Sequence, residues 1–485
     1  MVTPECAPVA QAGGLGEVVF GLSREMEIRG NTVEIILPKY RCMRYDQIYG
    51  LCVAYQDLWV PWYTGAVHCT VWFGFVHGRK CFFIEPHSPD GFFDRNNYYG
   101  DNDDAIRFAF FSKAAMEFML QSGKRPDVIH CHDWQTGLVP VLLFEQYQDV
   151  MPNQRVCLTI HNFRHQGICG DDALWATGLA PTSRYLVPER LADDHHKGAV
   201  NLLKGGIVYA NFVTTVSPRH TWEVCNTDQG MGLGHTLYLH RAKLGGILNG
   251  VDYDLWNPEI DRLIAHNYSA DELTGKYANK QALRNRLWLR DSYKPIVAYV
   301  GRLDEQKGVD LIQHAIFYAL RRNAQFVLIG SSSSETINER FWQIKHELND
   351  HPDCHLELEY NNELAHLIYA GSDLLVMPSK FEPCGLAQMI AMKYGTVPVV
   401  RGVGGLLDTV FDRDHSDRPV EQRNGYVFEE DYGAALEATL GRAIGLWFDF
   451  PDQFRQLMVN GMRTDNSWSR AGQDYLNVCD YVRHR

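Results

Sequence analysis

The feature that most limits what this chain can fold into is a repeated alternation of short apolar runs with stretches of helical periodicity. The runs Ile296–Val300 and Leu374–Met377 are short, aliphatic and bounded by turn residues, which is typical of buried strands. Helical stretches lie between such runs, with apolar residues recurring every three or four positions. Strands that alternate with helices in this way predict an α/β fold with parallel, doubly wound sheets.

The alternation occurs twice along the chain. In the first half the predicted strands are 32–38, 70–76, 81–84, 127–131, 156–160 and 212–216. In the second half they are 296–300, 325–329, 355–359, 374–377 and 397–400. One apolar face at helical spacing predicts helices over 107–121 and 468–482. Because 485 residues are too many for one core, we expect two α/β domains in tandem.

A glycine-containing segment separates the two halves. The sequence GGILNGVD at 245–252, followed by Trp256-Asn257-Pro258, combines a short strand, an Asn-Gly turn and a proline, as expected for a domain connection. The predicted organisation is therefore an N-terminal domain over 1–244, a hinge over 245–257, a C-terminal domain over 258–462 and a terminal helical segment over 463–485.

Charge and cysteine usage argue against several classes of partner. The formal net charge is −13, which disfavours nucleic acid or an anionic membrane. No apolar run approaches the ~18–20 residues of a membrane span, and no charged-then-apolar signal peptide opens the chain. The 12 cysteines include no C-x-x-C pair, so we expect reduced thiols in a reducing compartment rather than a disulfide framework or a zinc ribbon.

A glycine loop opens the first predicted helix. The sequence QAGGLGEV at 11–18 is followed by Val19, Leu22 and Met26 at helical spacing. The loop does not fit the G-x-G-x-x-G fingerprint, which disfavours a dinucleotide-dependent dehydrogenase. From the residues alone, the loop is either a tight turn or part of a ligand site.

The stretch from Pro378 to Gly405 combines the features of a ligand site. Glu382 and Gly385 follow a predicted strand and precede a helical pattern, and the next strand ends at Gly404-Gly405. Open α/β sheets bind ligands at the carboxyl ends of their strands, where helix amides and glycine loops hold anions. A carboxylate beside such a cradle can bind sugar hydroxyls, so this stretch predicts a site for a sugar joined to a phosphate.

Two cations follow another predicted strand. Arg302 and Lys307 lie just beyond 296–300, at the entry to a helix, where two positive charges beside helix amides form a strong diphosphate site. The alternative is a solvated surface pair. The chain contains no P-loop with Lys-Ser/Thr and no G-x-S-x-G, so P-loop kinases and α/β-hydrolases lack support.

The sequence does not indicate a metal site. His130 and His132 share one face of a predicted strand, but no second ligand pair with zinc spacing accompanies them. Asp-x-Asp tripeptides at 101–103, 252–254 and 412–414 are expected by chance in a chain with 59 acidic residues. Cations and helix ends can hold a diphosphate instead.

Short motifs along the whole chain resemble one family. In order they are QAGGLGEV, HCHDWQTGL, LTIHNFRHQG, NLLKGG, VTTVSP, GILNGVD, VGRLDEQKG, PSKFEPCGL and GGLLDTV. Their combination resembles the catalytic core of bacterial glycogen synthases and plant starch synthases, the family 5 glycosyltransferases. The segment EIILPKYRCMRYDQI is most similar to the branch of plant starch synthases III and IV.

The resemblance implies a fold and a reaction. The fold is GT-B, with two Rossmann-like domains facing a deep cleft and a C-terminal helix crossing back to the first domain. The reaction moves glucose from ADP-glucose to the non-reducing 4-OH of an α-1,4-glucan or maltooligosaccharide, with retention and without a metal or cofactor. The family's first strand is nearly missing, as expected of a chain trimmed at its N-terminus. The implied location is the cytoplasm, or the plastid stroma in a photosynthetic eukaryote.

The resemblance also implies residue roles. Arg302 and Lys307 would hold the diphosphate and stabilise its charge as ADP leaves, and Glu382 would bind glucose hydroxyls. His161 and Asn249 would contact the sugar near its 6-OH, with the His161 carbonyl close to the anomeric carbon. The other implied binding residues are Gln11, Gly13, Gly14, Glu17, Tyr99, Asp133, Asn162, Cys384, Gly385, Leu386, Gly404 and Gly405. Among these, Asp133 would support the wall beside His161, and Tyr99 would line the acceptor side.

Three positions depart from the family pattern. Gln11 stands where members carry Lys, Glu17 where they carry Asp, and Val403 where Thr precedes the Gly-Gly pair. Gln11 removes a cation that normally touches the donor phosphate or the acceptor side. Two hypotheses follow: an active ADP-glucose:α-glucan glucosyltransferase, or a glucan-binding or priming scaffold with weak turnover. A nucleotide-sugar epimerase is disfavoured by the full set of motifs.

Overall fold

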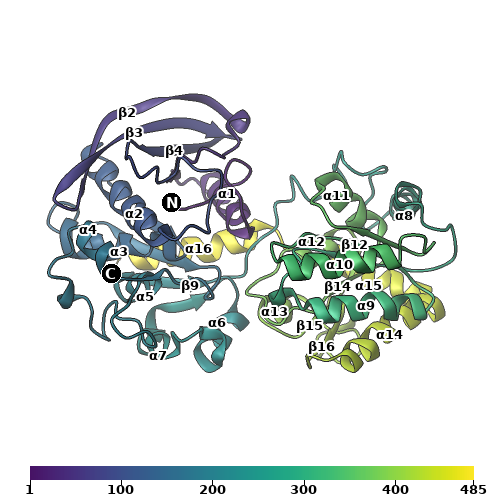
Figure 1. Ribbon diagram of the computed structural model, residues 1–485. Coiled ribbons are helices and arrows are strands. Elements are labelled where there is room, and N and C mark those ends of the chain that lie inside the picture. The colour runs from purple at the N-terminus through teal and green to yellow at the C-terminus, as the bar shows by residue number, and fades with distance from the viewer. Residues whose placement is uncertain (485) are drawn as a thin grey trace. The chain divides into compact units, whose positions relative to one another are not determined.

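The computed structural model describes residues 1–484, which form two compact units (Figure 1). Unit 1 comprises Met1–Gly250 together with the C-terminal helix α16 (Trp468–Arg483). Unit 2 comprises Val251–Ser467. Each unit contains a sheet of its own, so each is described separately.

The sheet of unit 1 is built from two four-stranded parts, with strand orders β1-β4-β3-β2 and β10-β9-β6-β5. The strands are β1 (Glu34–Pro38), β2 (Ile48–Trp62), β3 (Gly65–Val76), β4 (Arg79–Pro86), β5 (Val128–His132), β6 (Arg155–Ile160), β9 (Phe212–Thr215) and β10 (Leu244–Gly246). Val2 forms parallel bridges to Ile36 in β1 and to Cys131 in β5, so the first residues join the two parts. A separate ribbon pairs β7 (Ile168–Cys169) with β8 (Val200–Asn201).

β2 and β3 form a long antiparallel hairpin at one edge of this sheet (Figure 1). β3 also pairs antiparallel with β4, whereas the other strand pairs of both parts are parallel. This edge differs from the parallel sheet that the alternation predicts. The connections Tyr63-Thr64 and His77-Gly78 are too short to carry a crossover helix, so consecutive strands must run in opposite directions.

Seven helices of unit 1 precede α16 in the chain. They are α1 (Gly14–Ile28), α2 (Asp104–Gln121), α3 (Leu138–Leu142), α4 (Asp172–Ala176), α5 (Leu202–Tyr209), α6 (Pro218–Asn226) and α7 (Gly234–Leu239). α2 is buried over most of its length, and every residue from Arg107 to Met119 is buried. It covers the sheet with a row of phenylalanines that belong to the main apolar cluster of this unit.

α16 belongs to unit 1 because it packs on α1. The two helices share an apolar cluster that includes Val18, Leu22, Trp468 and Tyr475. Gly21 lies against the Trp468 indole so closely that a Cβ at this position would stand 2.0 Å from Nε1. The contact therefore depends on a glycine in the middle of α1.

Unit 2 contains a six-stranded, wholly parallel sheet with the order β13-β12-β11-β14-β15-β16. The strands are β11 (Ile296–Val300), β12 (Gln325–Ile329), β13 (Cys354–Glu357), β14 (Leu374–Met377), β15 (Val397–Arg401) and β16 (Tyr426–Phe428). Its helices are α8 (Thr274–Leu287), α9 (Val309–Arg321), α10 (Glu335–Glu347), α11 (Asn362–Gly371), α12 (Ala387–Lys393), α13 (Gly405–Thr409), α14 (Gly433–Asp449) and α15 (Pro451–Arg463). The strand order reverses between β11 and β14, and doubly wound sheets bind ligands at such a point.

The elements of unit 2 agree closely with the sequence prediction. β11, β12 and β14 have the predicted bounds, and the other predicted strands of the chain shift by a few residues at their ends. β2, β7, β8 and β16 were not predicted. Within residues 1–484, no helix combines the length and the apolarity needed to cross a bilayer.

Candidate functional site

Three loops of unit 2 meet at the carboxyl ends of β11, β14 and β15. Gly308 has φ 74°, and a Cβ there would stand 2.2 Å from the Pro378 carbonyl oxygen, so glycine permits the first loop to approach the second. The Gly405 N–H donates to the Glu382 carbonyl at 3.0 Å, which joins the second loop to the third. The sequence-predicted residues of these loops are thus brought into one cluster.

Lys307 and Glu382 form an ion pair at the centre of this loop cluster. Lys307 Nζ lies 2.6 Å from Glu382 Oε2, and Ser379 Oγ donates to the same oxygen at 3.0 Å. Only 18% of the Lys307 side chain and 6% of the Glu382 side chain are exposed. The predicted phosphate-binding cation and the predicted sugar-binding carboxylate therefore hold each other in this structure.

Arg302 lies on the same loop as Lys307 but outside the ion pair. Its side chain is 63% exposed, and Nη1 stands 3.4 Å from Asp304 Oδ2. Asp304 Oδ1 accepts the Lys307 N–H at 3.1 Å and so caps the short 3₁₀ turn Glu305–Lys307. The loop holds Lys307 firmly and leaves the Arg302 guanidinium at the surface.

The predicted glycine residues of unit 2 have special backbone conformations. Gly385 has φ 74° and Gly404 has φ 46°, values that favour glycine. A Cβ at Gly405 would stand 2.3 Å from the Cys384 carbonyl oxygen, so the two loops touch through their backbones. Leu386 precedes the first residue of α12. Gly385 and Leu386 follow Glu382 closely in sequence, and Gly405 is bonded to the Glu382 carbonyl, so these residues lie around the Lys307–Glu382 pair.

In unit 1, Asp133 and His161 follow the carboxyl ends of the neighbouring strands β5 and β6. Asp133 has φ 57° and ψ −175°, a region that few residues other than glycine adopt. Its Oδ1 accepts the His161 N–H at 2.6 Å. Burial raises the pKa of the Asp133 carboxyl to about 7, although backbone N–H groups of His161 and Asn162 oppose the shift. The carboxyl therefore titrates near neutral pH.

Three histidines form a column that ends at His161. The rings of His130 and His132 stack with centroids 4.3 Å apart, and His132 Nδ1 lies 3.1 Å from His161 Nε2. Burial lowers the pKa of His130 and of His161 to about 3, and that of His132 well below its ordinary value. All three imidazoles are neutral at pH 7, so His161 can exchange hydrogen bonds with a ligand without adding charge.

Asn249 follows β10 and is 4% exposed. Among the residues that the structure describes, none donates a hydrogen bond to its Oδ1. A buried polar atom without a partner costs ~1–3 kcal/mol, so this oxygen is well suited to accept a hydrogen bond from a ligand hydroxyl. No hydrogen bond within residues 1–484 joins its side chain to Asp133 or His161.

Glu5 organises the glycine loop, and no sequence motif pointed to it. Its Oε2 accepts the N–H groups of Ala12 and Gly13 at 2.7 and 3.0 Å, and its Oε1 accepts the Tyr99 hydroxyl at 2.8 Å. Glu5 is 4% exposed, so the accepting carboxylate is buried although its donors are partly exposed. Tyr99 and Gly13 thus hold Glu5, and Gly14 begins α1 directly after the loop.

Two of the residues that depart from the family pattern touch each other. Gln11 Nε2 donates to Glu17 Oε1 at 3.1 Å across the glycine loop, on the surface of unit 1. The third, Val403, is 6% exposed and its N–H donates to the Arg401 carbonyl at 2.9 Å. The first two substitutions therefore act as one pair, whereas Val403 is a buried apolar residue.

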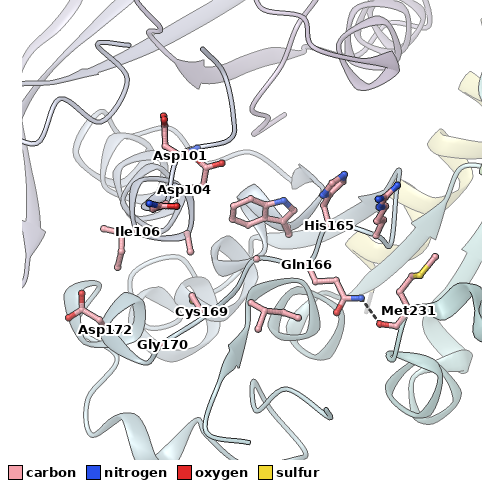
Figure 2. Close-up of a pocket in the computed structure, with 15 residues that line it drawn as sticks. Asp101, Asp104, Ile106, His165, Gln166, Cys169, Gly170, Asp172 and Met231 are labelled. Atoms are coloured by element: carbon pink, nitrogen blue, oxygen red, sulfur yellow. Dashed lines mark hydrogen bonds between the residues drawn. The ribbon is translucent and has the colours of Figure 1, made fainter. Parts of the chain in front are cut away.

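A pocket of ≈710 Å³ lies in unit 1 beside the loop that follows β6 (Figure 2). Its polar lining residues include Asp101, Asp104, Arg164, His165, Gln166 and Asp172. Figure 2 shows the Gln166 amide donating to the Met231 carbonyl, a bond of 2.8 Å. None of the predicted site residues lines this pocket, although Arg164 donates its N–H to Asn162 Oδ1 at 3.0 Å.

The Asp-x-Asp tripeptide at 101–103 forms a carboxylate cluster with Asp104 at one side of the pocket. Arg95 contacts Asp101 at 3.0 Å and Asp103 at 2.6 Å. The buried Arg107 guanidinium contacts Asp104 at 2.7 Å. Two guanidinium groups thus neutralise most, though not all, of the charge of these three carboxylates.

Comparison with known proteins identifies relatives over the whole chain. Residues 1–238 match the family described as starch synthase catalytic domain, and residues 284–447 match glycosyl transferases group 1. Glycogen synthase 2 of Methylococcus capsulatus (strain Bath) is 62% identical over 485 residues, which is 100% of both chains. Glycogen synthase 1 of Synechococcus sp. (strain JA-3-3Ab) is 63% identical over 486 residues, covering 100% of this chain and 99% of the relative.

Solved structures are similar as well. The catalytic domain of starch synthase IV from Arabidopsis thaliana bound to ADP and acarbose is 41% identical, with a TM-score of 0.96 over 100% of this chain and 99% of that one. Sucrose-phosphate synthase from Thermosynechococcus elongatus is 17% identical, with a TM-score of 0.62 over 99% of this chain and 98% of that one. The second similarity is one of fold alone.

Proposed function

The chain belongs to the starch and glycogen synthase family of glycosyltransferases, with a GT-B fold, and we propose that it moves glucose from ADP-glucose to the non-reducing end of an α-1,4-glucan. The observation that carries this proposal is the Lys307–Glu382 pair where the strand order of unit 2 reverses. A cation and a carboxylate at this point suit the two parts of a sugar nucleotide, its diphosphate and its sugar hydroxyls.

The two ligands are assigned to different units. The related starch synthase IV domain is bound to ADP and acarbose, and we infer ligands of the same classes here. The diphosphate would bind at the loop cluster of unit 2. The acceptor glucan would bind in the ≈710 Å³ pocket of unit 1, whose volume lies within the ~300–1,000 Å³ of typical ligand pockets. Its carboxylates and amides can hold sugar hydroxyls.

The cations of unit 2 would stabilise the leaving group. The bond between the anomeric carbon and the phosphate oxygen breaks, and ADP leaves with an additional negative charge. Lys307 and Arg302 would bind this charge as it develops, each contributing ~2–4 kcal/mol on the scale of oxyanion-hole donors. We assign no metal or cofactor to the step, because these two cations can supply the positive charge that it needs.

Glu382 is assigned to binding rather than to nucleophilic attack. A retaining enzyme with a covalent intermediate uses a free carboxylate next to the anomeric carbon. Glu382 is instead held by Lys307 and Ser379 and is 5% exposed. We therefore favour attack by the acceptor 4-OH on the face from which phosphate departs, with a leaving phosphate oxygen accepting the hydroxyl proton.

The neutral histidine column would position the donor sugar. His161 is uncharged at pH 7, because burial lowers its pKa to about 3. It can therefore exchange a hydrogen bond with a sugar hydroxyl, and the orphaned Asn249 oxygen can accept another. Asp133 fixes the His161 backbone at 2.6 Å and so orients this wall of the site.

The cysteines support a reducing compartment as the cellular setting of this proposed activity. All 12 cysteines are free thiols, which suits a reducing compartment such as a bacterial cytoplasm or a plastid stroma. The net charge of −13 gives no basis for a nucleic acid or an anionic membrane as a partner.

A second candidate function is a glucan-binding or priming scaffold with weak turnover. The observation that favours it is Gln11, which stands where the family carries a cation and is bound to Glu17 at 3.1 Å. A neutral amide cannot attract a donor phosphate or a developing charge as a lysine does. Such a scaffold would bind maltooligosaccharides and release almost no ADP.

Incorporation of labelled glucose into maltoheptaose tests the enzyme hypothesis. Lys307→Ala should reduce kcat/KM at least ~100-fold, the scale expected for lost transition-state charge stabilisation. Glu382→Ala should also reduce it strongly, because the sugar hydroxyls and Lys307 both lose their partner. The matched control is Lys380→Ala, because Lys380 lies in the same loop cluster but contacts the exposed Glu305 at 3.2 Å. Wild-type values of kcat/KM in both Lys307→Ala and Glu382→Ala would contradict the assignment of these residues to the active site.

A further inference from the structure

An exposed pair of aromatic rings lies at the tip of the long hairpin of unit 1. Tyr63 stands in the turn between β2 and β3, and Trp175 lies on α4. Their ring centroids are 4.9 Å apart at an interplanar angle of 65°. Tyr63 is 38% exposed and Trp175 is 48% exposed, so both rings present large apolar faces to solvent.

The hairpin tip is fixed to α4 by two hydrogen bonds. The Tyr63 N–H donates to the Ala176 carbonyl at 2.9 Å, and its hydroxyl donates to Asp172 Oδ2 at 2.6 Å. Tyr63 has φ 51°, which few non-glycine residues adopt. The rings are therefore held in place before any ligand arrives, and a pre-ordered surface loses less side-chain entropy on binding.

Asp172 connects the aromatic pair to the pocket. It lines the ≈710 Å³ pocket, where Figure 2 shows it at the side opposite Met231. The carboxylate that receives the Tyr63 hydroxyl is thus also part of the pocket wall. Tyr63 is bonded to this carboxylate and its ring packs on the Trp175 ring, so both aromatic side chains lie next to the pocket wall.

We propose that Tyr63 and Trp175 form a remote acceptor subsite, which binds the outer glucosyl units of an α-1,4-glucan whose non-reducing end lies in the pocket. The proposal rests on the function proposed above and extends its acceptor site. It commits to a glucan because the pair is continuous with the polar pocket, and because one face of a pyranose ring carries C–H groups that pack on an aromatic ring. Tyr and Trp combine such an apolar face with a polar group.

The subsite has a consequence for acceptor length. Under the proposal, a short acceptor such as maltotriose occupies the pocket alone, whereas a longer one such as maltoheptaose also contacts the aromatic pair. Wild type should therefore show a lower KM for maltoheptaose than for maltotriose. Loss of the aromatic pair should remove this difference in KM without changing the contacts of the reacting end of the glucan.

The test compares Trp175→Ala with Trp222→Ala. Trp222 is a matched control, because it is 50% exposed on α6 of the same unit and its ring contacts Arg219 rather than the pocket. In Trp175→Ala the KM for maltoheptaose should rise about tenfold, the scale of one lost stacking contact. The KM for maltotriose, the KM for ADP-glucose and kcat should stay within about twofold of wild type on the same scale. Trp222→Ala should resemble wild type throughout.

A second pair of variants separates packing from hydrogen bonding. Trp175→Phe keeps an aromatic face and should recover part of the maltoheptaose affinity. Tyr63→Phe keeps the ring but loses the bond to Asp172, so the loss should be smaller than for Trp175→Ala. Equal KM values for maltoheptaose in wild type and Trp175→Ala would overturn the subsite.

Calorimetric titration with maltoheptaose tests the subsite by binding alone, without any need for turnover. If wild type transfers no glucose to any acceptor, the proposed enzyme function fails. The subsite still stands if maltoheptaose binds and Trp175→Ala weakens this binding about tenfold relative to Trp222→Ala. Equal dissociation constants in these two variants overturn it.

Discussion

Gln11 is the residue at which this chain departs most from its family in chemistry. Its neutral amide is bound to the Glu17 carboxylate, so an amide stands where the family pattern places a cation opposite a carboxylate. We predict that Gln11→Lys raises kcat/KM for glucosyl transfer about three- to tenfold, because a cation lowers the energy of a developing negative charge by ~1 kcal/mol. Initial rates at several ADP-glucose concentrations measure the effect.

The double variant Gln11→Lys/Glu17→Gln is the control for this prediction. It adds the cation but removes the carboxylate that could bind it. The comparison therefore separates the effect of the positive charge on the reaction from the effect of an ion pair between positions 11 and 17. A kcat/KM that is unchanged or lower in both variants would contradict the prediction that a cation at position 11 favours glucosyl transfer.

Asp133 is expected to make stability depend on pH. Burial raises the pKa of its carboxyl to about 7 in the folded state. Because this lies above the unfolded value of ~3.9, its contribution to stability is fully present below pH 4 and is lost as pH rises through 7. Between pH 5 and pH 8 the free energy of unfolding should fall by about 2 kcal/mol through this group. Urea unfolding at several pH values measures it.

Asp133→Asn is the variant that isolates this titration. Asn has nearly the same shape as Asp and its amide oxygen can still accept the His161 N–H, so the backbone should be retained. The variant should lose the fall in stability between pH 5 and pH 8, whereas Asp94→Asn on the surface should keep it. Parallel pH profiles for wild type and Asp133→Asn would contradict the assignment.

At this scale, local sequence could predict some site residues and not others. Lys307 and Glu382 follow apolar strands within recognisable glycine loops, and the structure brings them to 2.6 Å. Glu5 has no such context, because its partner Tyr99 is 94 residues away in the chain and becomes a neighbour only after folding. The same holds for the Tyr63–Asp172 bond, which spans 109 residues.

Among the elements, the contact of α1 with α16 depends on one glycine. A Cβ at Gly21 would stand 2.0 Å from Trp468 Nε1, so the indole would have to move. We predict that Gly21→Ala lowers the free energy of unfolding by ~1–3 kcal/mol, the usual cost of overpacking. Thermal unfolding followed by near-UV circular dichroism reports the displaced tryptophan.

Gly445 in the middle of α14 provides the matched helix control. A Cβ there meets only Asp449 Oδ2, at 4.0 Å. Gly445→Ala should therefore gain the ~0.5–1 kcal/mol that alanine adds in a helix interior. A gain in stability in both variants would mean that α16 does not pack tightly on α1.

Strands were predictable where both faces are buried. β11, β12 and β14 are continuous apolar runs inside a parallel sheet, and their sequence bounds agree with the structure. β2 is an edge strand in which most residues from Ile48 to Val60 are partly or fully exposed, so its sequence lacks the apolar run of a buried strand. β2 is long because it pairs with β3 along its length, and this pairing cannot be predicted from the sequence of β2 alone.

For the whole molecule, the assignment of two ligands to two units can be tested by hydrogen exchange. ADP should slow exchange in unit 2, around the loops at 301–308, 378–386 and 402–405. Maltoheptaose should slow exchange in unit 1, around the pocket residues 164–172. At 100 times its dissociation constant, either ligand adds ~2.7 kcal/mol to the stability of the folded state.

The control for this experiment is Lys307→Ala. It should remove the protection by ADP and leave the protection by maltoheptaose intact. Protection of the unit 1 pocket by ADP, with no change in the three loops of unit 2, would reverse the assignment. Protection by maltoheptaose confined to unit 2 would do the same.

The ion pair between Lys307 and Glu382 also makes binding conditional on two things at once. A lone phosphate that draws Lys307 away leaves a carboxylate that is 6% exposed without its counter-charge, a loss of ~3–5 kcal/mol. A ligand that carries hydroxyls as well as a phosphate offsets this loss, because its hydroxyls donate hydrogen bonds to the Glu382 carboxylate. The site should therefore bind a lone phosphate weakly and bind a molecule that carries both a phosphate and a sugar tightly.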